Sequence, residues 1–262
     1  MTPAIQIIVI TIFACSLMVL LWCIQLVRKN AGIVDLGWAG GIGVSGIFCA
    51  ITSEGDLSRR FTVGLLICIW SFRLTFYLFR RMQGHAEESR YATLRQKWGT
   101  SANRWLFCFF QIQAVAVLLF VLPLLVACWN QAHLTIWDIL GIAIWVIGFS
   151  GVAIADSQLN QFKQSDKNRG KTCRAGLWYY TRHPNYFFEW VLWWCWLPFS
   201  IGNSYWWVAI ILPLLLLYTL VYKTGIPPTE AQAIASRGDD YRKYQKTTSA
   251  FIPWWPKKDF VE

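Results

Sequence analysis

Residues 105–128 read WLFCFFQIQAVAVLLFVLPLLVAC, a stretch without a single charged side chain. A helix rises about 1.5 Å per residue, so this stretch is long enough to cross roughly 30 Å of hydrocarbon. Similar blocks recur along the chain, which is 56% apolar and only 15% charged. Because a soluble domain carries about 25% charged residues, the composition excludes a soluble globular protein and predicts a polytopic membrane protein.

The apolar blocks predict an all-α fold with about seven membrane-spanning helices. The expected spans are 4–27, 32–51, 61–79, 105–128, 137–155, 186–201 and 205–222. The last two are short and nearly continuous, so we expect them to form a hairpin. Three hydrophilic stretches, 80–104, 156–184 and 223–262, separate or follow the spans.

The basic residues orient this arrangement. Of 24 arginines and lysines, 21 lie at residues 28–29 and in the three hydrophilic stretches, all on one side of a seven-span protein. The opposite side holds only Arg59 and Arg60, and Arg73 lies within a span. The positive-inside rule therefore predicts a cytoplasmic C-terminus and an external N-terminus. Membrane topology and attraction to lipid headgroups explain most of the net charge of +10. The basic loops are longer than a topology signal requires, so they could also bind an anionic ligand in the cytosol.

Several classes of function are disfavoured. Nucleic acid is not an expected partner, because the charge is divided among membrane loops and no nucleic-acid motif is present. The eight cysteines lie mostly inside spans and form no CxxC pair, so we expect packing residues and no metal site. No obligate protein partner is evident.

Ionisable residues within spans are costly and are candidates for function. Asp35 and Trp38 lie one helical turn apart in the second span, among six glycines that allow close approach, and we expect them in a pocket wall. The alternative for Asp35 is a helix start stabilised by the helix dipole. Arg73 and Tyr77 lie one turn apart in the third span.

The densest group of polar residues follows the fifth span. Asp156 is at its end, Lys163, Lys171, Arg182 and His183 supply donors suited to phosphates, and Asn185, Tyr186 and Glu189 open the sixth span. Asn185 and Glu189 are one turn apart and share a helix face. A basic loop that binds lipid headgroups is the alternative, and it does not explain Glu189.

The C-terminal stretch continues this pattern. Glu230, Arg237, Tyr241 and Tyr244 recur at helical spacing, with the last three on one face of a short amphipathic helix. The motif Phe251-Ile-Pro-Trp254-Trp255-Pro follows, and its aromatic residues predict an anchor at the membrane surface.

These motifs resemble the steroid 5α-reductase-like membrane family. The residues that carry the resemblance are Ser157-Gln-Leu, Gly176-Leu-Trp, Arg182-His-Pro-Asn-Tyr, Glu189, Glu230, Arg237, Tyr241, Tyr244 and Ile252-Pro-Trp. The resemblance is greatest to the bacterial branch, a domain of unknown function, and also covers Arg90-Tyr91, Arg95 and Trp98-Gly99. It implies a multi-pass protein, most naturally of the bacterial inner membrane, with seven helices and NADPH bound from the cytosol.

The resemblance also implies roles for individual residues. Asp156, Lys163, Lys171, Asn185 and Glu189 match positions that contact the cofactor, the two lysines standing in place of arginines. Arg182-His183-Pro184 is similar to sterol Δ14-reductases and isoprenylcysteine carboxyl methyltransferases, and Glu230 stands where the 5α-reductases carry a histidine. A single membrane domain over 1–262 is expected, with 1–104 lining the substrate pocket and 105–262 forming the cofactor-binding part.

The leading hypothesis is an NADPH-dependent oxidoreductase that reduces a C=C bond conjugated to a carbonyl in a steroid-like or other lipidic substrate. Negative charge develops on the carbonyl oxygen during such a reduction, so an acid is required, and Asp35 or Tyr77 could supply it. Trp38 and Arg73 would line the substrate pocket. The alternatives are a methyltransferase that uses S-adenosylmethionine on a lipid-embedded substrate and a non-enzymatic lipid-binding protein.

Overall fold

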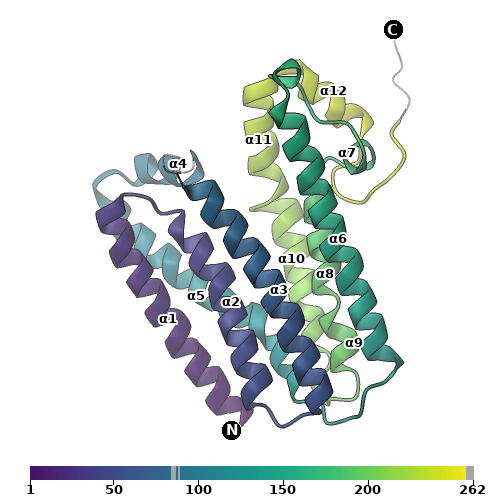
Figure 1. Cartoon of the computed structure of the whole chain (residues 1–262). Coiled ribbons are helices and arrows are strands. Elements are labelled where there is room, and N and C mark those ends of the chain that lie inside the picture. Colours follow the sequence, from purple (N-terminus) through teal and green to yellow (C-terminus); the bar gives the residue numbers. More distant parts are fainter. Residues whose placement is uncertain (84–86, 88, 258–262) are drawn as a thin grey trace. The chain divides into compact units, whose positions relative to one another are not determined.

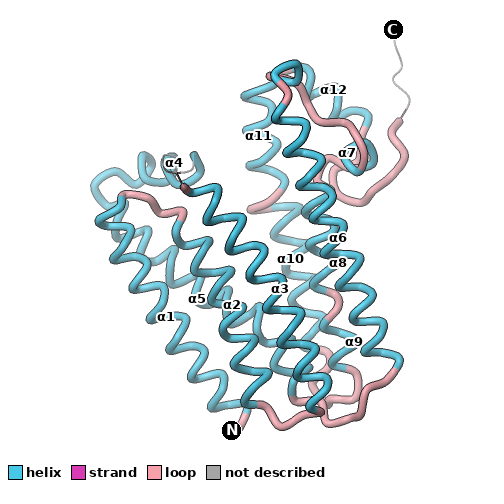
Figure 2. The backbone as a smooth tube through the Cα atoms, viewed as in Figure 1, coloured by secondary structure: helices cyan, strands magenta, loops and turns pink. Residues whose placement is uncertain are grey.

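The computed structural model describes residues 1–83, 87 and 89–257 (Figure 1). Over these residues the chain is helical and contains no strand, only an isolated bridge between Thr181 and Ser249 (Figure 2). The predicted all-α fold is therefore confirmed. Contacts between Cα atoms divide the chain into two compact units. Unit 1 comprises Met1–Thr135 with Phe199–Ala209, and unit 2 comprises Ile136–Pro198 with Ile210–Glu262.

Six helices of the described residues are long and apolar enough to cross a membrane, which identifies a multi-pass membrane protein. They are Pro3–Arg28, Ile33–Thr52, Leu57–Met82, Arg90–Cys128, Ile136–Gln164 and Val208–Arg237. Arg90–Cys128 and Val208–Arg237 each run over two consecutive helices that are described separately below. Large apolar side chains on these helices are exposed, for example Ile12, Phe72 and Ile139. Such faces are suited to lipid, because a helix in hydrocarbon satisfies its backbone internally and gains nothing from a polar surface.

Unit 1 is built around α2 (Ile33–Thr52), which packs against α3 (Leu57–Met82) and α5 (Ala102–Cys128). Glycines on α2 permit this packing. A Cβ atom on Gly43 would lie 2.2 Å from Ser71 Oγ of α3, and one on Gly46 would lie 2.8 Å from Leu124 of α5. Helix α1 (Pro3–Arg28) packs on α5, and α4 (Ser89–Trp98) precedes α5. Residues 105–128 of α5, which were expected in the cofactor-binding part, therefore pack with α1 and α2.

Unit 2 is built on α6 (Ile136–Gln164) and α8 (Pro184–Trp193), with α7 (Leu177–Tyr180) before α8. Glycines again set the contact, because Cβ atoms on Gly148 and Gly151 would lie within 3 Å of Leu192 and Phe188. Trp190 of α8 donates to the carbonyl of Pro213 in α10 (Val208–Tyr222) at 3.0 Å. The short helices α11 (Ile226–Arg237) and α12 (Asp239–Thr247) complete the unit.

Two sequence-based expectations differ from the structure. The expected continuous span at 186–201 is two short helices, α8 and α9 (Trp196–Ser200), separated by a turn at residues 194–195. The expected single helix over Glu230–Tyr244 is interrupted at Gly238, whose φ of 55° and ψ of −126° end α11 and start α12. A helix does not continue through such dihedral angles, which favour glycine. Arg237 and Tyr241 consequently lie on different helices.

Candidate functional site

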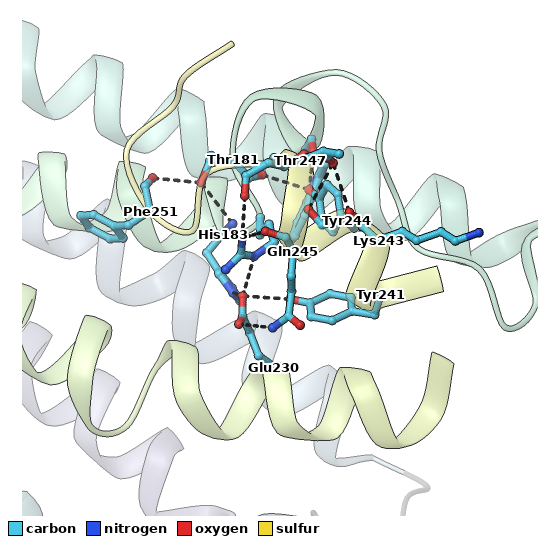
Figure 3. A network of polar contacts seen from close by, with 12 residues as sticks. Thr181, His183, Glu230, Tyr241, Lys243, Tyr244, Gln245, Thr247 and Phe251 are labelled. Carbon is cyan, nitrogen blue, oxygen red and sulfur yellow. Dashed lines mark hydrogen bonds and ion pairs between the residues drawn. The ribbon is translucent and has the colours of Figure 1, made fainter. Parts of the chain in front are cut away.

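The residues between α7 and α8 lie against the segment that follows α12. The backbone N–H of Arg182 donates to the carbonyl of Ser249 at 2.9 Å. The Thr181 hydroxyl donates to the carbonyl of Phe251 at 2.9 Å (Figure 3). Pro184 then begins α8, since a proline in the first turn lacks only an N–H that the helix leaves unpaired. These contacts fix the backbone of residues 181–184 within unit 2.

Glu230 of α11 is the centre of a polar cluster (Figure 3). Its Oε1 accepts from Arg182 Nε at 2.6 Å, from His183 Nε2 at 3.2 Å and from the Tyr241 hydroxyl at 3.2 Å. Its Oε2 accepts from Gln245 Nε2 at 2.6 Å. The side chains of Glu230 and Arg182 are only 13% and 11% exposed. We call Arg182, His183, Glu230, Tyr241 and Gln245 the Glu230 cluster.

Four further hydrogen bonds hold the cluster together. Arg182 Nη1 donates to the carbonyls of Gln245 and Thr248, so both Nε and Nη1 of this guanidinium are engaged within the protein. The Tyr244 hydroxyl donates to the carbonyls of Trp178 and Thr181. The structure therefore brings together five predicted cofactor residues, Arg182, His183, Glu230, Tyr241 and Tyr244, through contacts with one another and with the backbone.

Burial determines the protonation of the cluster. Desolvation lowers the pKa of His183 below its ordinary value, against the opposing effect of the Glu230 carboxylate. It also raises the pKa of both Tyr241 and Tyr244. At neutral pH the histidine is therefore uncharged and the tyrosines remain protonated, so that Arg182 and Glu230 form the only ion pair within the cluster.

The hydrogen bond to Glu230 fixes the tautomer of His183. A carboxylate only accepts, so Nε2 of the neutral ring carries the hydrogen and Nδ1 has a lone pair. Among the described residues Nδ1 has no hydrogen-bond partner. The ring stacks on Tyr186, with centroids 5.3 Å apart, and the Tyr186 hydroxyl lies 3.1 Å from Thr229 Oγ1. His183 thus offers an acceptor held in a fixed orientation.

The α6–α8 register brings other predicted cofactor residues to one level. Gly148 contacts Leu192 and Gly151 contacts Phe188, so the helices run antiparallel. If this antiparallel pairing is continued by about one more turn of α6, Asp156 lies opposite Asn185 of α8, and Glu189 lies one turn further along α8. Glu189 accepts from Trp193 Nε1 at 3.0 Å. Asn185 Oδ1 accepts from the N–H of Tyr186 at 3.0 Å, whereas its Nδ2 has no partner among the described residues.

The remaining predicted cations lie outside the Glu230 cluster. Lys163, on the last turn of α6, and Lys171 are both exposed. The guanidinium of Arg237 lies 5.0 Å from the ring centroid of Tyr241. Both lysines belong to the same unit as Asn185 and His183.

Sequence reasoning missed several residues of this site. Gln245 is one turn after Tyr241 on α12, a spacing that could have revealed it. Thr181 and Asp240 gave no such signal. Asp240 accepts from the backbone N–H of Thr172 at 2.7 Å and from Arg174 at 2.9 Å. Burial alone would raise the pKa of Asp240, but its hydrogen bonds with Thr172 and the charge of Arg174 hold that pKa below its usual value.

In unit 1, Asp35 lies in the first turn of α2 and is held by the segment around α4. Its carboxylate accepts from Arg90 Nη2 at 2.7 Å and from the Tyr91 hydroxyl at 2.8 Å. A second carboxylate nearby in sequence, Glu87, accepts from Arg95 and from the N–H of Ala31. Both oxygens of the Asp35 carboxylate are therefore engaged by side chains of the segment around α4.

The other predicted pocket residues of unit 1 are partly accessible. The Trp38 ring packs edge-on against Trp70 and Phe120, with centroids 6.0 and 5.0 Å away. On α3, Arg73 is half-buried and Tyr77 is 42% exposed. The structure brings neither of them into the Asp35 contacts described above. Among the described residues, no three His, Cys, Asp or Glu side chains gather in a group that could hold a metal ion.

A comparison with protein families gives one match. Residues 21–248 match the family described as "Protein of unknown function (DUF1295)". No curated protein and no solved structure matches the chain.

Proposed function

We propose that the chain, which belongs to the DUF1295 family over residues 21–248, a match that spans both units, is a membrane-embedded reductase that uses NADPH. Its substrate would be a lipidic molecule with a C=C bond conjugated to a carbonyl. The observation that carries the proposal is the pair of open polar atoms at the start of α8. Asn185 Nδ2 and His183 Nδ1 lack partners among the described residues, while Glu230 orients the His183 ring and the Tyr186 N–H orients the Asn185 amide.

These two atoms suit a nucleotide cofactor. The amide nitrogen is a donor and the imidazole Nδ1 an acceptor, the combination that the edge of a carboxamide or an adenine requires. Orientation of this kind costs little on binding when the side chains are already fixed. Lys163 and Lys171 are exposed in the same unit and supply positive charge for phosphates. Their ammonium groups are compact charges, unlike the planar guanidinium of arginine, which can form two parallel hydrogen bonds. The residues present are therefore compatible with NADPH.

When bound, NADPH would supply the hydride that the β-carbon of the substrate requires. The protein has to stabilise the negative charge that develops on the carbonyl oxygen. Since both oxygens of Asp35 already accept from Arg90 and Tyr91, we favour the Tyr77 hydroxyl as the proton donor of the two sequence candidates. Trp38 and Arg73 remain candidates for the substrate pocket.

A methyltransferase that uses S-adenosylmethionine is the second candidate. It is favoured by one observation, the engagement of Arg182 with Glu230 and two carbonyls, which removes a cation from those available to phosphates. A sulfonium cofactor carries a positive charge and no phosphate, so it needs fewer cations. The exposed Lys163 and Lys171 still favour NADPH.

Binding to the detergent-purified full chain tests the proposal, with NADPH, NADH and S-adenosylmethionine titrated in parallel. We expect NADPH to bind most tightly. Asn185→Ala should weaken its binding about tenfold or more, because a lost hydrogen bond contributes roughly 1.4 kcal/mol. Asn103→Ala, which changes an exposed asparagine of unit 1, is the matched control and should bind normally. Equal millimolar binding of all three compounds would contradict the proposal.

A further inference from the structure

The segment after α12 forms a strap that is fixed on one side and exposed on the other. The strap comprises residues 249–257. Phe251 is 7% exposed, and its ring lies 5.7 Å from that of Phe187 and 5.6 Å from that of Trp190, both on α8. By contrast Ile252, Trp254 and Trp255 are 61%, 71% and 70% exposed. Large apolar groups gathered in this way indicate a surface that something apolar covers.

Backbone contacts place the exposed tryptophans near the start of α8. The N–H of Trp254 donates to the carbonyl of Tyr180 at 2.9 Å, four residues before Pro184, and the Trp255 ring contacts Tyr180 edge-on. The apolar part of α8 begins at this level, so the tryptophans lie where the chain is expected to leave the hydrocarbon. Indole side chains favour this boundary because one edge is polar and the rest apolar.

Basic residues lie beside the tryptophans. The N–H of Lys257 donates to the carbonyl of Thr247 at 2.8 Å, which brings the exposed Lys257 next to the exposed Lys246 at the end of α12. Adjacent cations and exposed indoles fit a surface that is both apolar and anionic. A bilayer that contains anionic phospholipids has this combination.

We propose that the strap docks on the anionic surface of the membrane and thereby stabilises the Glu230 cluster. The second part follows from the contacts between the strap and residues 181–182. The carbonyls of Ser249 and Phe251 accept from the Arg182 N–H and the Thr181 hydroxyl, and that of the preceding Thr248 accepts from the Arg182 guanidinium. Holding the strap in place therefore holds the arginine that pairs with Glu230. The inference does not depend on the cofactor.

Hydrogen–deuterium exchange of the full chain in nanodiscs tests this proposal. Nanodiscs of phosphatidylcholine alone are compared with nanodiscs that contain 30% phosphatidylglycerol. We expect the amides of Arg182, Trp254 and Lys257 to exchange about five- to thirtyfold more slowly in the anionic discs. Each lysine near an anionic surface contributes roughly a fivefold factor, and two are present.

Variants separate the two parts of the surface. Lys246→Gln with Lys257→Gln should abolish the difference between the discs, whereas Lys97→Gln with Arg104→Gln, which removes the same charge from unit 1, should preserve it. Trp254→Ala with Trp255→Ala should speed exchange in both discs, unlike Trp206→Ala with Trp207→Ala. Equal exchange of the wild-type chain in the two discs, or a difference that survives loss of both strap lysines, would overturn the proposal.

Discussion

At the scale of single residues, Glu230 shows how one buried carboxylate can organise a site. It accepts four hydrogen bonds from side chains on two separate segments, residues 182–183 and helix α12 with Tyr241 and Gln245. Separating the charge of Arg182 from that of Glu230 would leave a buried ion without a partner, which is costly in a region that water scarcely reaches. Glu230 therefore specifies the position of Arg182 as well as contributing to stability.

Glu230→Gln should destabilise the protein strongly. The substitution removes the negative charge beside Arg182, and it places an amide nitrogen opposite either Gln245 Nε2 or the Arg182 and His183 donors. We expect a loss of roughly 3 kcal/mol, seen as a fall in the thermal unfolding midpoint of about 10 °C. Asp239→Asn is the control, since Asp239 and its partner Arg242 are 84% and 59% exposed. That change should alter stability by less than about 0.5 kcal/mol. Similar shifts in both variants would argue against the cluster as a buried unit.

At the scale of elements, the packing of α6 against α8 determines how three predicted site residues are placed along the two helices. Asp156, Asn185 and Glu189 come to neighbouring turns because Gly148 and Gly151 let the two helices approach closely. The amino-acid pattern of either helix alone does not reveal this register, which depends on the residues that meet across the contact.

Gly148→Ala should therefore disturb the pair. The new methyl group would lie 2.6 Å from Leu192 Cβ and 2.7 Å from its Cα and backbone nitrogen, so the helices have to separate. We expect a cost of about 1–3 kcal/mol, measured by thermal unfolding. Gly40→Ala on α2 is matched to it, because its nearest neighbour would be Thr75 Oγ1 at 3.8 Å. If the two alanines proved equally harmless, the close approach of α6 and α8 would be wrong.

At the scale of the whole molecule, the number of crossings decides the orientation. Six described helices are long and apolar enough to span, and α8 with α9 is the remaining apolar stretch. A seventh crossing through residues 184–200 is required if the N-terminus and C-terminus lie on opposite sides. The distribution of arginine and lysine, 21 of 24 on one side of a seven-span arrangement, predicts that they do.

Reporter fusions at each end of the full chain test this orientation. We expect a C-terminal green fluorescent protein to fluoresce in the cytoplasm, and an N-terminal reporter to be active only outside it. If both ends proved cytoplasmic, the stretch at α8 and α9 would not cross the membrane. The assay needs no activity, so its result is separate from the test of NADPH binding.

The sequence by itself determined the fold class and most of the spans. Apolar blocks such as 105–128 are read directly from composition, since the cost of exposing polar backbone to lipid forces them into helices. It also identified most members of the Glu230 cluster by residue type. It did not reveal the break at Gly238 or the division at residues 194–195, where local dihedral angles override an apolar or helical pattern.

Only the tertiary structure decided how the polar residues are used. By its sequence pattern Arg182 is a candidate hydrogen-bond donor to a phosphate group. In the structure it is the internal ion-pair partner of Glu230. Asp35 is a candidate acid by pattern and a partner of Arg90 and Tyr91 in the structure. The physical reason is that a charged side chain binds whichever opposite charge or carbonyl the fold places within reach, and contacts across 48 or 55 residues leave no local trace in the sequence.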